Sequence, residues 1–320
     1  MLFPFQILFS FGVIFGTLIA VSSTSWFTAW MGLELNLISF LPIIFKESKM
    51  GSNESGLKYF FIQAVASLLI LVGSLFPLYL NSFGVSLISL SLFMKMGVAP
   101  LHFWLPPIIE GLSWFSCLIL LTWQKLAPLW LISEFDPIFI IPLISVLIGS
   151  LGGFNQSSLK KILAYSSIMH MGWMMSGVML SLSLGMKYFG VYLFFSLFLV
   201  LMFAEKNILE LNQLMVSDSF ISISILLLML SMGGLPPFLG FFPKWYVITE
   251  LLSQNVLLSL FLIFSSLINL FFYFRLFYTG MFLEGLSSKV LIFKKSEEKK
   301  LFFAVFFSSF GGIFYPLLFM

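Results

Sequence analysis

The amino-acid sequence predicts an all-α polytopic membrane protein, and three observations lead to that fold class. Of its 320 residues, 60% are hydrophobic and 9% are charged, whereas a soluble domain carries about 25% charged residues. The apolar residues form long runs, and about 20 apolar residues are enough to cross a bilayer as a helix. Short polar stretches separate these runs. On this basis we expect about 11 transmembrane helices.

The limits of the expected helices are set by the ends of the apolar runs. The first run lacks the basic region and the cleavage site of a signal peptide, so we expect it to be retained as a helix. The polar stretches 46–58, 205–218 and 284–300 are expected to be loops. The helices are expected at residues 4–21, 25–45, 58–80, 84–104, 112–133, 137–153, 161–180, 187–205, 219–240, 251–279 and 301–319.

Two of the expected helices carry a break, in SLFMKMGVAPLHFWLP (residues 91–106) and in LSMGGLPPFLGFFPKW (residues 230–245). A proline inside a helix removes a backbone hydrogen bond that lipid cannot replace, so such a helix belongs inside a bundle. The breaks lie five helices apart, and an odd offset makes the two repeats inverted in the membrane. We expect one membrane domain over 1–320, with inverted five-helix repeats at 1–135 and 136–280, a charged loop at 281–300 and a C-terminal helix at 301–320.

The lysines predict the orientation of the chain. Most of them fall in the loops after the second, sixth, eighth and tenth expected helices, while the alternate loops hold only Lys187 and, at a helix boundary, Lys244. By the positive-inside rule, the N-terminus lies on the side of the lysine-rich loops and the C-terminus lies opposite. The lysines of these loops are Lys46, Lys49, Lys58, Lys160, Lys161, Lys206, Lys289, Lys294, Lys295, Lys299 and Lys300.

Three charged residues lie in the middle of apolar runs, namely Glu34, Lys95 and Lys125. A charge inside the membrane costs free energy, so ionisable residues at such depth are functional candidates by default. The structural alternatives are a carboxylate that only sets helix packing, and lysines that extend to the interface. Proton affinities of buried acids and lysines respond to nearby charge, which suits these residues to a proton path.

Three further candidates have stronger structural alternatives. Lys244 follows the second break and precedes Trp245, so it could also be an interfacial anchor. His102 lies in the first broken segment and His170 lies in AYSSIMHMGWMM. A single histidine in a membrane helix is often an interhelical hydrogen-bonding group rather than a proton relay.

The composition excludes several other kinds of chemistry. The chain has one cysteine and two histidines, too few for an iron–sulfur cluster or for the paired ligands of two haems. It has no GxGxxG after a strand, no Walker loop, no CxxC and no HExxH. We therefore expect no cofactor and no metal in this chain, no binding of nucleic acid, and a role in moving charge rather than electrons.

Six segments occur in order and together resemble one family. They are WMGLELNLISFLP, LKYFFIQA, KMGVAPLHFWLP, LLTWQKLAP, GGFNQSSLKKILAYSSIMHMGW and GGLPPFLGFFPKW. The set closely resembles the subunit 2 family of mitochondrial NADH:ubiquinone oxidoreductase, respiratory complex I. The motifs extend from about Trp26 to Trp245, and the general hydropathy extends the likeness to essentially the whole chain.

The resemblance implies an antiporter-like subunit with inverted five-helix repeats. It implies that Glu34 pairs with Lys95, that Lys125 is the connecting lysine and that Lys244 is the lysine on the second broken helix. His170 would have an auxiliary role. Compared with the fourteen-helix members that it resembles, the chain is expected to lack about three N-terminal helices, which would leave one side of its first half more exposed to partner subunits.

The resemblance also implies where the chain works and with what. It implies a subunit of NADH:ubiquinone reductase (H⁺-translocating) with no redox centre in this chain, since FMN, iron–sulfur clusters, NADH and ubiquinone belong to partner subunits. The implied partners are the other membrane-arm subunits of complex I and membrane lipids. The implied location is the mitochondrial inner membrane, with the N-terminus on the matrix side and the C-terminus on the intermembrane-space side.

The mechanism that follows is electrostatic. We expect that Glu34 holds Lys95 protonated and that a signal from a neighbouring subunit weakens this pair. The proton would then pass through water and Lys125 toward Lys244 and out to the intermembrane side. Two other functions fit the same charges. One is a stand-alone or Mrp-type cation/proton antiporter subunit, and the other is a structural scaffold of the membrane arm that carries no protons.

Overall fold

The computed structural model describes residues 3–45, 50–75, 81–135, 139–214 and 219–284. These residues fold into α-helices, one short 3₁₀ helix and an isolated β-bridge between Ser158 and Glu210. The chain forms two compact units, Met1–Ile141 and Pro142–Met320. The helix expected at 301–319 lies outside the described residues, as does most of the expected charged loop.

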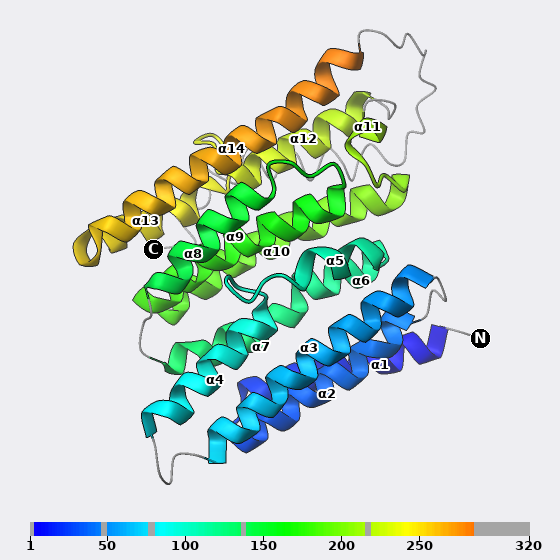
Figure 1. Ribbon diagram of the computed structural model, residues 1–320. Helices are drawn as coiled ribbons and strands as arrows, with labels where there is room; N and C mark the ends of the chain where they lie inside the picture. The colour runs from blue at the N-terminus through cyan, green and yellow to red at the C-terminus, as the bar shows by residue number, and fades with distance from the viewer. Residues whose placement is uncertain (1–2, 46–49, 76–80, 136–138, 215–218, 285–320) are drawn as a thin grey trace. The chain divides into compact units, whose positions relative to one another are not determined.

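Unit 1 is built from helices that follow one another and pack in sequence order (Figure 1). The first helix packs on the second, the second on the third, and the third on the fourth and fifth. The seventh helix returns to pack on the fourth and the first. The elements are α1 (Phe3–Val21), α2 (Trp26–Phe45), α3 (Met50–Leu75), α4 (Asn81–Met96), α5 (Leu105–Gly111), α6 (Trp114–Leu121), α7 (Trp123–Leu131) and the 3₁₀ helix η2 (Ile132–Glu134).

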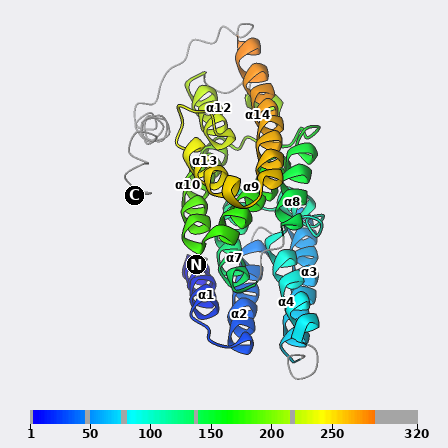
Figure 2. The same cartoon turned by 90° about the vertical axis from the view of Figure 1, so that its left-hand side faces the viewer.

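Unit 2 contains α8 (Ile140–Gly152), except for its first residues, and the helices that follow it. Its long helices pack in two groups, α9 against α10 and α13, and α12 against α10, α13 and α14. Figure 2 shows α12 and α14 side by side. The further elements are α9 (Leu159–Leu180), α10 (Leu182–Lys206), α11 (Leu211–Leu214), α12 (Ser219–Gly233), α13 (Phe241–Gln254) and α14 (Val256–Glu284).

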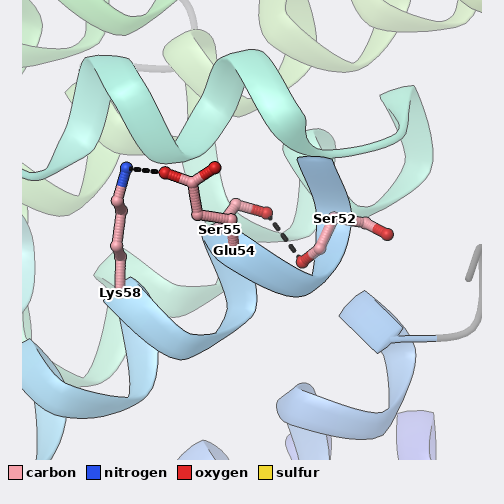
Figure 3. Close-up of polar contacts among 4 residues, drawn as sticks. All are labelled: Ser52, Glu54, Ser55 and Lys58. Atoms are coloured by element: carbon pink, nitrogen blue, oxygen red, sulfur yellow. Dashed lines mark hydrogen bonds and ion pairs between the residues drawn. The ribbon is translucent and has the colours of Figure 1, made fainter. Parts of the chain in front are cut away.

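The prediction of a loop over 46–58 is wrong for its second part, where α3 already runs. The polar residues there are compatible with a helix because they pair along it. Lys58 donates to Glu54 one turn earlier at 2.5 Å, and the Ser55 hydroxyl donates to the Ser52 carbonyl at 2.9 Å (Figure 3). An ion pair at the spacing of Glu54 and Lys58 stabilises a helix. Ser52 and Ser55 are also buried, so packing against neighbouring helices stabilises this part of α3 although its hydropathy is low.

The breaks expected from glycine and proline are present. The helix expected at 84–104 ends as α4 at Met96, and a turn with Gly97 at φ +70° leads to α5. Within the range 219–240, where one helix was expected, α12 ends at Gly233, and Gly234 follows with φ at +85°. A further break divides 112–133 at Thr122, where φ is −113° and ψ is −76°. That break has no glycine, so the sequence did not indicate it.

Five helical segments within the described part of the chain are long and apolar enough to cross a membrane, by length and composition. Shorter apolar helices lie at Ile7–Val21, Phe83–Met96, Ile140–Gly152 and Ser224–Gly233. The fold is therefore an all-helical one of membrane type. The five segments are Trp26–Phe45, Met50–Leu75, Trp114–Glu134, Leu182–Glu205 and Val256–Arg275.

Helix α9 is long but is not among these five segments, because it carries many polar residues. Its residues are nevertheless buried on almost every side, and they include Ser166, His170 and Trp173. A polar helix is tolerated in a membrane protein when other helices, rather than lipid, surround it. α9 is thus the central helix of unit 2.

The contact between α1 and α2 depends on small residues. Gly16 and Gly32 bring the two backbones together, and a Cβ on Gly32 would lie 2.6 Å from the Ala20 nitrogen and 2.8 Å from the Gly16 oxygen. Membrane helices associate by such close packing, since lipid offers no hydrophobic driving force between them. A side chain at either position would have to move backbone atoms.

We predict that Gly32→Ala destabilises unit 1 by about 1–3 kcal/mol, the usual cost of overpacking a well-packed site. The measurement is the midpoint of thermal aggregation in detergent-solubilised membranes. Gly190→Ala is the matched control, because nothing lies within 4 Å of a Cβ at that helix position. Equal midpoints for the two variants would contradict the close packing.

Candidate functional site

The break after α4 is capped by the backbone. Gly97 adopts φ +70°, its N–H donates to the Met94 carbonyl at 3.1 Å, and the Val98 N–H donates to the Phe93 carbonyl at 3.1 Å. This is the Schellman arrangement of a helix C-terminus, which glycine favours because it lacks a Cβ. The indole N–H of Trp104 also donates to the Met94 carbonyl, at 3.1 Å. Two carbonyls of the last turn of α4, those of Phe93 and Met94, are therefore satisfied without a lysine.

Lys95 lies in the last turn of α4, and its side chain is 6% exposed. The negative charge that acts on it is Glu34 of α2. No ion pair within 4.0 Å joins Glu34 to Lys95 among the residues that the structure describes. Glu34 is half-buried, and its Oε2 is buried without a hydrogen-bond partner. The structure thus brings the expected pair into electrostatic range but not into contact.

Lys125 lies in α7, just after the break at Thr122, and is 2% exposed. Two side chains beside it fix α7 to its neighbours. The Trp123 indole donates to the Thr17 hydroxyl at 3.3 Å, and the Gln124 amide donates to the Asn36 amide oxygen at 2.9 Å. Since α7 also packs on α4, the helices that carry the three candidates of unit 1 are joined to one another.

Lys244 is held by the end of a broken helix. Its ammonium donates to the carbonyl oxygens of Met232 and Gly233, at 3.1 and 2.7 Å. These are carbonyls of the last turn of α12, which have no partner within the helix. The negative end of the helix dipole also favours a cation there. Lys244 is therefore a side-chain cap of α12, supplied by α13.

The surroundings of Lys244 are closed. The side chain is 5% exposed, and its ammonium lies 5.8 Å from the centre of the Trp173 ring, within cation–π range. A Cβ on Gly234 would lie 3.0 Å from Lys244 Cδ and would crowd the lysine, and the φ of +85° at Gly234 also favours glycine. This burial does not fit an interfacial anchor, although the neighbouring Trp245 is 50% exposed.

His170 lies on α9 among aromatic residues of α10. Its Nδ1 is 3.0 Å from the Tyr188 hydroxyl, and its ring centre is 5.3 Å from that of Tyr192. Beside it is a small cavity in which about 10 Å³ is open to the centre of a water molecule, room for one water. The cavity is lined by His170, Tyr188, Val191, Tyr192, Phe195, Met232, Gly240 and Pro243. Met232 and Pro243 place this cavity next to the capped end of α12.

His102 lies in the turn between α4 and α5 and is 4% exposed. Its ring centre is 4.3 Å from that of Phe103, and its Nδ1 is buried without a hydrogen-bond partner. No hydrogen bond or ion pair between described residues joins His102 to the other candidates.

Several residues at the site were not found from the sequence. Asn36, Gln124 and Thr17 fix α7, the helix that carries Lys125, and Tyr188 contacts His170. Each of them is an uncharged polar residue inside an apolar run, and only the charged residues of such runs were taken as candidates. Within the described residues, no group of three or more His, Cys, Asp or Glu side chains could hold a metal ion.

Broken helices with buried lysines define an antiporter-like membrane protein. The model of the family "NADH:quinone oxidoreductase/Mrp antiporter, TM" matches residues 23–82 and 74–269. The NADH-ubiquinone oxidoreductase chain 2 of Anopheles gambiae is 43% identical over 94% of this chain and 94% of its own. The NADH-ubiquinone oxidoreductase chain 2 of Locusta migratoria is 37% identical over 86% of this chain and 85% of its own. This chain belongs to the NADH-ubiquinone oxidoreductase chain 2 family, which confirms the resemblance predicted from its motifs.

Solved structures share the fold. A chain of respiratory complex I from Thermus thermophilus matches with a TM-score of 0.83 and 21% identity, over 98% of this chain and 79% of its own. A chain of the Mrp complex from Dietzia sp. DQ12-45-1b matches with a TM-score of 0.81 and 16% identity, over 96% and 74%. The antiporter-like fold is therefore common to both kinds of complex.

We predict that Lys244→Met loosens the end of α12. The carbonyls of Met232 and Gly233 lose their donor, and an unsatisfied buried group costs about 1–3 kcal/mol. Amide hydrogen exchange of the last turn of α12, followed by mass spectrometry, should become faster. Lys187→Met is the control, since Lys187 is an exposed lysine of the same unit. Unchanged exchange in α12 would mean that the two hydrogen bonds do not hold the helix end.

Proposed function

We propose that the chain is a core membrane-arm subunit of the proton-pumping NADH:ubiquinone oxidoreductase, complex I. It would form part of a proton path driven by electron transfer in other subunits. The observation that carries the proposal is the burial of Lys95, Lys125 and Lys244, at 6%, 2% and 5% exposure, in a chain of this family. Moving one charge against 100 mV costs about 2.3 kcal/mol, and electron transfer elsewhere would supply that energy.

In unit 1, the proposed working parts are Glu34, Lys95 and Lys125. The charge of Glu34 acts on Lys95 without a direct ion pair. A small movement of α2 against α4 would therefore change their interaction strongly, because the Coulomb energy varies with separation where no water screens it. Lys95 would then release or take up its proton, with Lys125 as the next group.

In unit 2, the proposed proton carrier is Lys244, and His170 is an auxiliary group. An ammonium has three N–H donors, and the two carbonyls of α12 occupy two of them. The third proton is the one that can leave. The neutral amine keeps two donors, so Lys244 can lose a proton and still cap the helix. The cavity beside His170 is large enough for one water near this position.

The rest of the assignment is proposed from the family. The chain would lie in the mitochondrial inner membrane with about 11 spans in two inverted repeats, its N-terminus on the matrix side and its C-terminus on the intermembrane-space side. Its partners would be the other membrane-arm subunits and membrane lipids. Neighbouring subunits would carry FMN, the iron–sulfur clusters and the sites for NADH and ubiquinone.

A second candidate is a subunit of a cation/proton antiporter of Mrp type. The family model names both kinds of protein, and the fold matches the Mrp complex of Dietzia. The relatives at 37–43% identity are all named as chain 2 of the oxidoreductase. This favours complex I.

The test of the assignment is a native gel of mildly solubilised mitochondrial membranes, stained for NADH dehydrogenase activity. Mass spectrometry should find this chain in the active band of high mass. If it were found only in a small inactive band, the antiporter would become the better proposal, and sodium/proton exchange would be the next assay.

We predict that Lys125→Met lowers the number of protons moved per NADH oxidised in sealed membranes, because methionine keeps the volume of the buried side chain and carries no proton. The complex should still assemble, and NADH oxidation should persist with an uncoupler present. Lys187→Met is again the control. A proton ratio equal to that of the control would exclude Lys125 from the proton path.

A further inference from the structure

A second group of buried polar side chains lies beside the α12 break. Asn269 and Tyr273 stand one turn apart on α14, and Ser166 of α9 faces them, at 1%, 0% and 2% exposure. The Tyr273 hydroxyl lies beside the side chains of both Ser166 and Asn269. The candidate path described above includes none of these three residues, which we call the α14 cluster.

Two atoms of the α14 cluster, Tyr273 Oη and Asn269 Nδ2, are buried without a well-formed hydrogen bond. The Ser166 hydroxyl is already used, because it donates to the Leu163 carbonyl at 2.9 Å. A polar group that is buried without a partner lowers stability. A water molecule is the usual solution where several polar groups converge. Here a hydroxyl, an amide and a serine oxygen converge.

The α14 cluster adjoins Lys244. A Cβ on Gly233 would lie 3.2 Å from Tyr273 Cδ2, so the Tyr273 ring packs directly on the Gly233 backbone. The carbonyl of Gly233 accepts the shorter of the two hydrogen bonds from Lys244, at 2.7 Å. The side chain of the preceding residue, Met232, lines the cavity beside His170. The end of α12 thus borders two polar sites, the His170 cavity and the α14 cluster.

The α14 cluster also leads to one end of unit 2. Arg275, two residues after Tyr273, donates from Nη1 to the Phe154 carbonyl at 2.5 Å. Phe154 is 38% exposed and belongs to the turn between α8 and α9. Six residues separate Asn269 from Arg275, which is about 9 Å along a helix. The turn is followed by Lys160 and Lys161 at the start of α9.

We propose that Ser166, Asn269 and Tyr273 bind water and connect Lys244 to the α8–α9 end of unit 2. This inference rests on the proposed function, since it supplies Lys244 with a proton from that end. In this proton transfer, a hydronium ion at the cluster gives one proton to the neutral amine of Lys244. The hydronium ion becomes water, and the amine becomes an ammonium. The Tyr273 hydroxyl donates one hydrogen bond and accepts another, and it ends the step unchanged.

A structural role for the α14 cluster makes a different prediction about stability. If the three side chains served to fix α14 on α9 by hydrogen bonds, apolar replacements would destabilise the protein. If they hold water, apolar side chains of equal shape release that water and break no hydrogen bond between α9 and α14, so stability stays equal or rises. Asn269→Leu and Tyr273→Phe are such replacements.

The experiment uses intact complex I carrying the double variant Asn269→Leu/Tyr273→Phe. Protons moved per NADH are measured in sealed membranes, and the thermal midpoint is measured on the purified complex. Ser265→Ala is the matched control, because Ser265 is fully buried on the same helix and its hydroxyl already donates to the Leu262 carbonyl. Lys244→Met is measured beside it.

We expect the double variant to lower the proton ratio as much as Lys244→Met does, with an unchanged or higher thermal midpoint. A normal ratio in the double variant together with a lowered ratio in Lys244→Met would overturn the water route and leave the proposed function standing. Normal ratios in both would remove both proposals. A lowered midpoint with a normal ratio would assign the cluster a structural role and overturn the inference.

A second measurement decides the matter if the double variant does not assemble. A density map of the unaltered complex that resolves ordered water should show a water within about 2.7–3.2 Å of both Tyr273 Oη and Asn269 Nδ2. A dry cluster in such a map would overturn the inference.

Discussion

The carbonyl groups at a broken helix are the constraint on which the arrangement depends. Lipid offers them no donor, so the protein must supply one wherever a helix stops inside the membrane. At the end of α4 the supply is local, from Gly97, Val98 and the Trp104 indole. At the end of α12 it comes from another helix, as the ammonium of Lys244. The two breaks therefore differ in what their lysines do. Lys244 caps the end of its broken helix, whereas Lys95 lies beside a helix end that other groups cap.

This difference gives the two lysines different physical properties. Lys95 lies beside a helix end that is already capped, so burial, opposed by the charge of Glu34, sets the energy of its ammonium. Lys244 is held by two carbonyls and, as an ammonium, by the face of Trp173, so two hydrogen bonds can keep it in place after its third proton has left. Gly234 and Gly240 fit the same constraint, because a Cβ on Gly234 would crowd Lys244 and one on Gly240 would overlap the Ser231 carbonyl oxygen. Lys95 is suited to sense charge, and Lys244 is suited to hold a proton at a fixed place.

The sequence predicted what depends on local pattern. Apolar runs located the helices, and Gly97 and Gly234 stand at the two breaks where glycine and proline indicated them. It failed over 50–58, because the pairing of Glu54 with Lys58 stabilises a helix that hydropathy does not detect. It could not find the Asn36–Gln124 hydrogen bond, whose partners are 88 residues apart. Nor could it find the partners of Lys244, because backbone carbonyls are the same at every residue. Only the tertiary packing determines which backbone carbonyls lie within reach of a lysine side chain.

The burial of α9 explains how so many polar groups can gather in unit 2. Ser166, His170 and Trp173 follow at spacings of four and three residues, so they lie on one face of the helix. Ser166 belongs to the α14 cluster, His170 lines the small cavity, and Trp173 lies beside the ammonium of Lys244. On a lipid-facing helix such a row would be costly, but α9 is enclosed by protein. A central polar helix therefore allows a fixed lysine to have polar neighbours on more than one side, and that is the condition for a proton to arrive by one route and leave by another.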